Sequence, residues 1–216
     1  MKKLLAFAAM LFAGTFAFSQ ITTAAQFFSS VSDYYATLTD YETNLNITIG
    51  RKKLSGKVSF KRPEMLRIDF TSPADQVIVF DGDNYKCYLP ESSAILEQAV
   101  SGNSANLSKG LSLMSRYYTI AYESGQDPVA LEEGSEEMVV NLILSRRTAS
   151  EEFRTIKLSV NPTTKLIRRV TATSTKNEVY VFDFTEYSTN IGISEKRFVY
   201  DPPTSANNYS NFLFSE

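Results

Sequence analysis

The sequence predicts an α+β fold built on one large, curved antiparallel sheet, an unclosed half-barrel of about 10–11 strands. Three observations predict it. Short segments along most of the chain alternate apolar and polar residues, as half-buried strands do. Short turns separate many of them, which favours antiparallel neighbours. Only two segments have helical periodicity, and a sheet this large curls, so an N-terminal helix and a short inserted helix would cover only part of it.

Composition supports a globular protein and excludes several functional classes. The chain has 216 residues, 43% of them hydrophobic, which suits one core. Its 22 Lys and Arg nearly balance 24 Asp and Glu without a basic patch, so we expect no nucleic-acid partner. No His is present, so the commonest general base and metal ligand are missing. We therefore expect no enzyme activity, catalytic residue, metal or cofactor. Cys87 is the single cysteine, so no intramolecular disulfide can form.

The N-terminus reads as a signal peptide over residues 1–19. Lys2 and Lys3 precede an apolar run over residues 4–18 that is short for a membrane span. Small residues at Ala17 and Ser19 predict cleavage before Gln20. No Cys follows the run, so no lipid anchor is expected. The prediction is an exported, soluble domain over residues 20–216; a permanent N-terminal anchor is the alternative.

The first helix is predicted over residues 22–40, where Thr22 or Thr23 can cap the start. Its apolar positions fall on one stripe at helical spacing. The stripe comprises Ala24, Phe27, Phe28, Val31, Tyr34, Tyr35 and Leu38. Such a helix packs on a sheet face, and here it would also cover a cavity that the sheet does not fill.

Six strands are predicted before the second helix. They span residues 41–50, 54–62, 66–71, 76–80, 84–89 and 93–99. Asp81-Gly82 is a typical hairpin turn between two of them. Val58, Phe60 and Arg62 share one parity, so Arg62 ends a run of apolar residues on the apolar face.

The inserted helix is predicted over residues 105–116. Leu107, Leu111 and Met114 recur at helical spacing, with Leu113 beside them. Gly110 weakens this helix by about 1 kcal/mol relative to Ala. A short, weakened, apolar helix fits a movable lid and an ordinary connecting helix equally well.

The second half of the chain predicts five longer strands and a short closing one. They span residues 117–122, 138–145, 153–160, 166–174, 178–187 and 198–200. Residues 123–137 hold six carboxylates with Gly and Pro, which predicts a solvated loop rather than a calcium or hydrolytic site. Residues 204–216 form a polar tail, with Phe212, Leu213 and Phe214, that we expect to dock on the edge of the body.

Several short segments carry a family resemblance. They are Phe60-Lys61-Arg62-Pro63, then Pro73, Val77-Ile78-Val79-Phe80-Asp81-Gly82, Tyr88-Leu89-Pro90 and finally Phe198-Val199-Tyr200-Asp201-Pro202-Pro203. In order and spacing they resemble the periplasmic outer-membrane lipoprotein carriers, the LolA family, over the chain after residue 20. The resemblance implies a half-barrel with a helical lid over a hydrophobic chamber. It also implies a monomeric periplasmic carrier that takes acylated lipoproteins from an inner-membrane releasing transporter to an outer-membrane acceptor.

The resemblance further implies that Arg62 is a latch that hydrogen-bonds the lid and closes the empty chamber. The lid would then be the segment of Leu111, Leu113 and Met114. A guanidinium on an apolar face must donate its hydrogens to some acceptor. The alternatives are a surface residue at a strand end and an ion pair with Glu64.

The apolar parities supply candidates for binding acyl chains. They are Phe27, Val31, Tyr34, Leu45, Ile47, Val58, Phe60, Leu66, Ile68, Phe70, Tyr180, Phe182 and Phe184. Whether such a residue lines a chamber or packs in a core depends on whether the space opposite is filled.

Three other functions compete with a carrier. A sensory module with the same half-barrel would normally have a further domain. An enzyme could use the chamber as its active site, although the chain has no His and no recognisable nucleophile–base spacing. A surface adhesin would show lipidation or repeats.

Overall fold

The computed structural model describes residues 22–99 and 110–210. The predicted signal peptide, the first part of the predicted second helix and Phe212, Leu213 and Phe214 lie outside these ranges. The two helices are α2 (Ala24–Thr37) and α3 (Gly110–Tyr117). Short 3-10 helices span Pro90–Ser92 and Glu195–Phe198.

Thirteen strands occur in the described ranges. They are β1 (Asp40–Ile49), β2 (Lys52–Lys61), β3 (Met65–Ser72), β4 (Val77–Phe80), β5 (Asn84–Leu89), β6 (Ala94–Ala99), β7 (Tyr118–Tyr122), β8 (Val129–Ala130), β9 (Met138–Arg146), β10 (Phe153–Val160), β11 (Ile167–Ser174), β12 (Val179–Thr189) and β13 (Asn207–Ser210). Their order is β13-β6-β5-β4-β3-β2-β1-β12-β11-β10-β9-β7, with β8 beside β9. The ends β13 and β7 do not meet, so the predicted α+β fold with an open half-barrel is confirmed.

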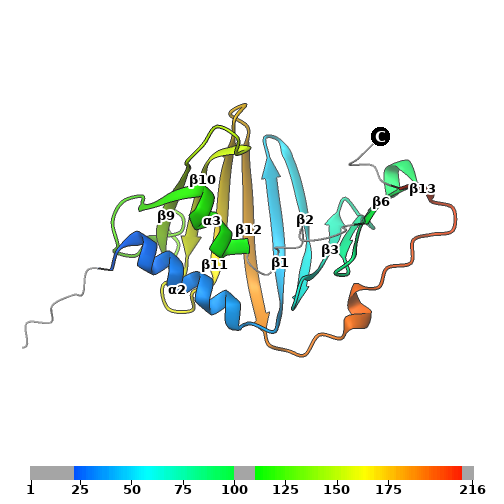
Figure 1. The fold of residues 1–216 in the computed structure, drawn as a ribbon, viewed down its shortest axis with the longest axis horizontal. Helices are drawn as coiled ribbons and strands as arrows, with labels where there is room; N and C mark the ends of the chain where they lie inside the picture. Colours follow the sequence, from blue (N-terminus) through cyan, green and yellow to red (C-terminus); the bar gives the residue numbers. More distant parts are fainter. Residues whose placement is uncertain (1–21, 100–109, 211–216) are drawn as a thin grey trace, which may run out of the picture.

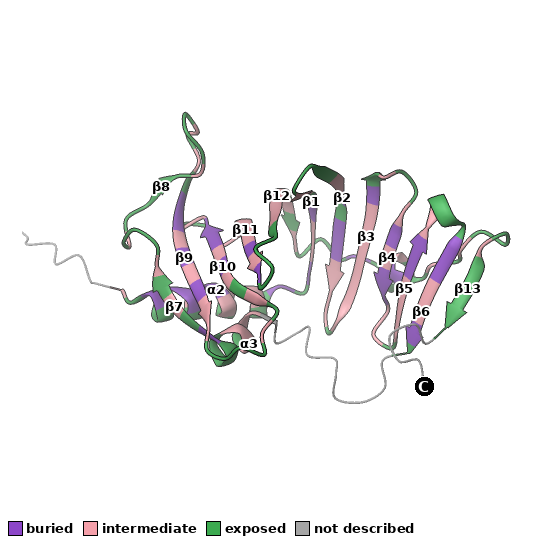
Figure 2. Ribbon diagram, turned by 90° about the horizontal axis from the view of Figure 1, so that it is seen from above, coloured by how far each residue is buried: buried purple, intermediate pink, exposed green. Residues whose placement is uncertain are grey.

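Both helices lie on one face of the sheet, which we call the inner face (Figures 1 and 2). Strand register shows which residues share it. Tyr41 pairs with Phe60, and Leu45 pairs with Gly56 on one side and Phe184 on the other. Because directly paired residues point to the same side, one apolar face continues across the sheet. The alternation in the sequence therefore assigned the apolar parities correctly.

The first helix begins one residue after its cap. The Thr23 hydroxyl accepts a hydrogen bond from the Gln26 backbone N–H at 3.2 Å, and the Gln26 side chain accepts one from the Thr23 backbone N–H at 3.0 Å. This reciprocal capping box satisfies two backbone donors that a helix start leaves open. The helix thus occupies Ala24–Thr37, inside the range predicted from its apolar stripe.

The C-terminal segment differs most from the prediction. The predicted strand over residues 198–200 is wrong, because the chain makes a 3-10 turn at Glu195–Phe198 instead. Phe198 is buried behind the sheet with Val79 and Ile193, and this packing on the outer face outweighs the local alternation. Residues 207–210 of the predicted tail do dock on the sheet edge, since β13 pairs in parallel with β6. Strands β13 and β8 raise the count above the 10–11 expected.

The acidic segment 123–137 is more ordered than a solvated loop. Its strand β8 pairs with β9. Glu137 forms an ion pair with Arg168, and Glu132 forms one with Arg169. These contacts, together with the pairing of β8, fasten the segment to strands β9 and β11.

Candidate functional site

One half of the inner face is closed by α2. Phe27, Phe28 and Val31 of this helix are buried in one cluster with Leu142 and Leu158 of the sheet. The cluster spans β7, β9, β10 and β11, and Leu111 and Met114 of α3 pack against it. Here the space opposite the strands is filled, so these residues form a conventional core.

The other half of the inner face, on strands β1 to β6, is only partly covered. Leu45, Val58, Phe70 and Phe80 are buried there, but other apolar residues of the same parity stay half-buried; they include Ile47, Phe60, Leu66, Ile68, Ile78 and Leu96. The register pairs Phe60 with Leu66, and Ile68 with Val58 and Ile78, so the surface is continuous. In Figure 1 the helices lie over the strands from β9 to β12, while β3 and β6 have no helix in front of them. We call this surface the open half.

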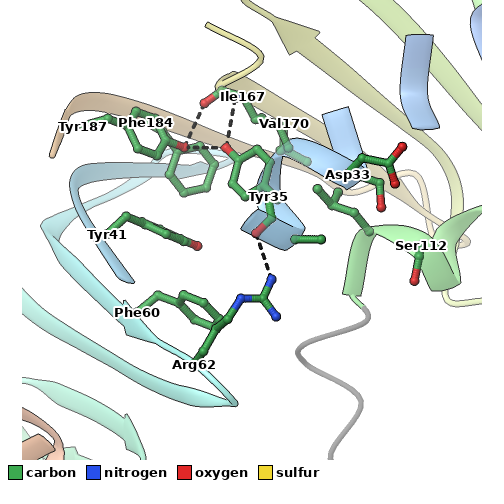
Figure 3. A pocket seen from close by; sticks show the side chains of 13 residues that line it. Asp33, Tyr35, Tyr41, Phe60, Arg62, Ser112, Ile167, Val170, Phe184 and Tyr187 are labelled. Carbon is green, nitrogen blue, oxygen red and sulfur yellow. Dashed lines mark hydrogen bonds between the residues drawn. The ribbon is translucent and has the colours of Figure 1, made fainter. Parts of the chain in front are cut away.

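A pocket of about 510 Å³ lies where the two halves meet. It is formed by α2, α3, β1, β2, β11 and β12 (Figure 3). The residues that line it are Ser32, Asp33, Tyr35, Ala36, Tyr41, Phe60, Arg62, Leu111, Ser112, Ile167, Val170, Phe184 and Tyr187. Most of its wall is aromatic or aliphatic, and its volume falls in the usual range for small-molecule sites.

Two tyrosines line the pocket where α2 meets β11 and β12. The Tyr35 hydroxyl accepts a hydrogen bond from the Ile167 backbone N–H at 3.0 Å, and the Tyr187 hydroxyl donates to the Ile167 carbonyl at 2.9 Å. The two hydroxyls are 3.2 Å apart. Burial raises the pKa of both phenols, so they remain neutral. This network joins α2 to β11 and β12.

Aromatic stacking builds the wall beside that network. The Tyr41 ring stacks on Phe60 with centroids 5.1 Å apart, and Tyr35 meets Tyr41 edge-on at 6.1 Å. Both arrangements are favoured by the quadrupoles of the rings. Because Tyr41 and Phe60 are paired residues on adjacent strands, the strand register itself aligns the rings.

Arg62 joins the end of α2 to the end of β2. Its Nε donates to the Leu38 carbonyl at 2.6 Å, and its Nη2 donates to the Tyr35 carbonyl at 3.0 Å. Both carbonyls lie at the C-terminal end of α2, where the helix dipole is negative and backbone acceptors are available to side chains. The acceptors found for the Arg62 side chain thus belong to the N-terminal helix rather than to the lid of Leu111, Leu113 and Met114. The latch role itself stays a prediction.

The predicted chamber residues divide into three groups. Phe60 and Phe184 line the pocket, as do Arg62 and Leu111. Ile47, Leu66, Ile68, Tyr180 and Phe182 are half-buried on the inner face. The others either are buried (Phe27, Val31, Leu45, Val58 and Phe70) or, like Tyr34, are half-buried on α2. Leu113 is half-buried on α3.

The sequence analysis did not identify Tyr35, Tyr41 and Tyr187 as residues that line the pocket. Tyr35 stood on the predicted helical stripe, and Tyr41 has the parity of Leu45, so both could have been found. Tyr187 could not, because its parity is opposite to that of Phe184. Glu186 between them has φ +54°, an irregularity that shifts the face of the strand.

The described ranges contain no group of three or more acidic, Cys or His side chains that could hold a metal ion. Within residues 22–99 and 110–210, no helix has the length and apolar character needed to cross a bilayer. The site is therefore described by its apolar wall, its phenols and Arg62.

Comparison with known proteins fits this geometry. The family model for the outer membrane lipoprotein carrier protein LolA matches residues 48–201, which include most of the open half and the pocket strands β2, β11 and β12. The chain belongs to the LolA family. No curated protein sequence matches it.

Two solved structures share this fold at low identity. An uncharacterized conserved protein from Thermus thermophilus has 15% identity and a TM-score of 0.59, with 85% of this chain and 98% of that chain covered. A chain in the complex of Pseudomonas aeruginosa MucA/MucB has 14% identity and a TM-score of 0.53; 82% of this chain is covered, and it spans 61% of that chain. At these identities the likeness shows the fold alone.

Proposed function

We propose that this LolA-family protein is a periplasmic carrier that holds the acyl chains of lipoproteins on the open half and in the pocket beside it. The observation that carries the proposal is the continuous apolar surface of β1–β6, on which several residues stay half-buried, together with the adjoining pocket of about 510 Å³.

The energetics of the cargo require such a surface. Each buried methylene contributes about 0.8 kcal/mol, so a chain of about fifteen methylenes resists exposure to water by about 12 kcal/mol. Apolar burial is non-directional, so one aromatic-lined surface can accept chains without reading their detail. The carrier would receive its cargo from an inner-membrane releasing transporter and give it to an outer-membrane acceptor. It needs no catalytic residue for this transfer.

Release requires a second state of similar free energy. The tie between Arg62 and the end of α2 is one candidate for the element that changes, since it lies at the pocket wall. Cargo that enters under α2 would displace this end of the helix. In this proposal Arg62 sets how easily the pocket opens.

Native mass spectrometry of residues 20–216 tests the function. We expect a one-to-one complex with a triacylated lipoprotein and none with its non-acylated form. Two variants on β3 sharpen the test, because Ile68→Asp puts a carboxylate on the inner face and Thr71→Asp puts one on the outer face. Only Ile68→Asp should weaken the complex. Failure of the wild type to bind the acylated form would exclude the lipoprotein carrier.

A further inference from the structure

The Tyr41 hydroxyl differs from the other two phenols of the pocket. Tyr35 and Tyr187 bond to each other and to the Ile167 backbone. Within the described residues, the Tyr41 hydroxyl has no hydrogen-bond partner, although its ring is held by Phe60 and Tyr35. Figure 3 shows this hydroxyl at the end of a ring that extends from β1 into the pocket. The pocket wall thus contains an oriented phenol donor for which the described residues offer no acceptor.

The Tyr41 hydroxyl limits which ligands can bind in this apolar pocket, because a buried donor needs an acceptor. In the free protein, water can satisfy the hydroxyl. A ligand that fills the pocket displaces this water and must supply an acceptor, or the buried hydroxyl loses its hydrogen bond. A purely hydrocarbon ligand has no acceptor, so it would be disfavoured next to Tyr41.

The surroundings of Tyr41 select the kind of acceptor. The Tyr41 phenol and the Arg62 guanidinium both donate, and both line the pocket together with Phe60, on which the Tyr41 ring stacks (Figure 3). Burial raises the pKa of Tyr41, so the phenol stays protonated and acts as a neutral donor. A carbonyl oxygen on an otherwise apolar molecule matches this arrangement.

We propose that Tyr41 is a specificity residue that donates a hydrogen bond to the carbonyl oxygen of an acyl linkage. The inference rests on the proposed carrier function and extends it. The pocket then holds the linkage end of an acyl chain, whereas the open half holds the remainder of the chain. The carrier distinguishes acylated cargo from other hydrocarbon by this carbonyl.

The test compares two synthetic lipopeptides with identical peptides and chain lengths. One carries two acyl chains in ester linkage, and the other carries two alkyl chains in ether linkage and has no carbonyl there. We expect wild type to bind the diester about three- to tenfold more tightly, the effect of one net hydrogen bond. Tyr41→Phe should remove this preference. The control Tyr200→Phe removes a hydroxyl behind the sheet, near Tyr88 and Arg67, and should keep the preference.

A spectroscopic measurement separates a direct contact from a folding defect. With a 13C label at the ester carbonyls, wild type should shift the carbonyl stretch of the bound diester to lower wavenumber, and Tyr41→Phe should not. If Tyr41→Phe keeps both the diester preference and the shift, the role of Tyr41 is wrong while the carrier function stands. If wild type binds neither lipopeptide, the carrier function itself is wrong.

Discussion

The two halves of the inner face have the same apolar alternation but different surroundings. Leu142 and Leu158 in the closed half are at most 2% exposed under α2, whereas Leu66 and Ile68 in the open half remain half-buried. The difference follows from what lies opposite the strands, since α2, with α3 beside it, covers the closed half. The same alternation therefore lies against a filled core in one half and on a partly uncovered surface in the other.

The largest expected effect is on the closed half. Leu142→Ala removes a fully buried side chain and leaves a cavity, so we expect it to lower the free energy of unfolding by about 2–5 kcal/mol. Leu66→Ala in the open half should cost only about 1 kcal/mol, because that side chain is already partly in water. Urea unfolding of both variants measures the difference. Equal losses would mean that the open half is packed like a core.

The next effect concerns the tie between the halves. Arg62→Leu removes two hydrogen bonds from a charged donor to carbonyls at the end of α2, so this end of the helix loses its tie to β2. We expect faster hydrogen exchange at the end of α2 and little change in β9 and β10. Lys57→Leu, which removes an exposed ion pair with Glu42, serves as control. Unchanged exchange in Arg62→Leu would show that the helix end needs no tie.

Lowering the pH should weaken the ion pairs of Asp69, which lie on the outer face behind the open half. Burial alone would raise the pKa of Asp69, but hydrogen bonds and charges from Arg67 and Arg197 outweigh it and hold this pKa below its ordinary value of 3.8. Because the pKa is lowered in the folded protein, this contribution to stability is complete above that ordinary value and is lost as the pH falls through the lowered pKa.

The segment that should loosen is residues 197–200, since Arg67 donates to the carbonyls of Arg197 and Val199 and lies over the Tyr200 ring. NMR signals of Tyr200 should change below about pH 4, the ordinary range of a carboxyl. In Asp69→Asn this acid transition should be absent. A transition that persists in the variant would assign the change to another group.

The smallest effect is expected at the exposed ion pair of Glu132 with Arg169. This pair belongs to neither the closed half nor the open half of the inner face. Glu132→Gln should change the free energy of unfolding by only about 0.2–1 kcal/mol, because Glu132 is largely in water and Arg169 keeps Asp183. Thermal unfolding monitored by circular dichroism is sufficient to measure it. A loss as large as that of Leu142→Ala would show that segment 123–137 is part of the core.

The sequence predicted the sheet well because its information is periodic. Alternation assigned Leu45, Phe60 and Ile68 to one face, and the stripe with Thr23 before it located α2. It could not predict what depends on tertiary contacts. The turn at Phe198 follows from packing behind the sheet, and Tyr187 faces the pocket only because of the irregularity at Glu186.

The candidate site was predicted less completely than the fold. Phe60, Arg62 and Phe184 were identified from parity and resemblance, and all three line the pocket. The acceptors of Arg62 could not be predicted, because they depend on where α2 ends relative to β2. Phe27 and Val31 were indistinguishable from lining residues in the sequence, since only the structure shows that the space opposite them is filled.

Photo-cross-linking with a lipopeptide whose acyl chains carry a diazirine tests the central claim most directly. Mass spectrometry would locate the labelled residues. We predict adducts on Phe60, Ile68 and Ile78 of the open half and none on Val199, which is 63% exposed behind the sheet. Adducts mainly on the outer face, or equal labelling of Val199 and Ile68, would contradict the assignment of the open half as the acyl-chain surface.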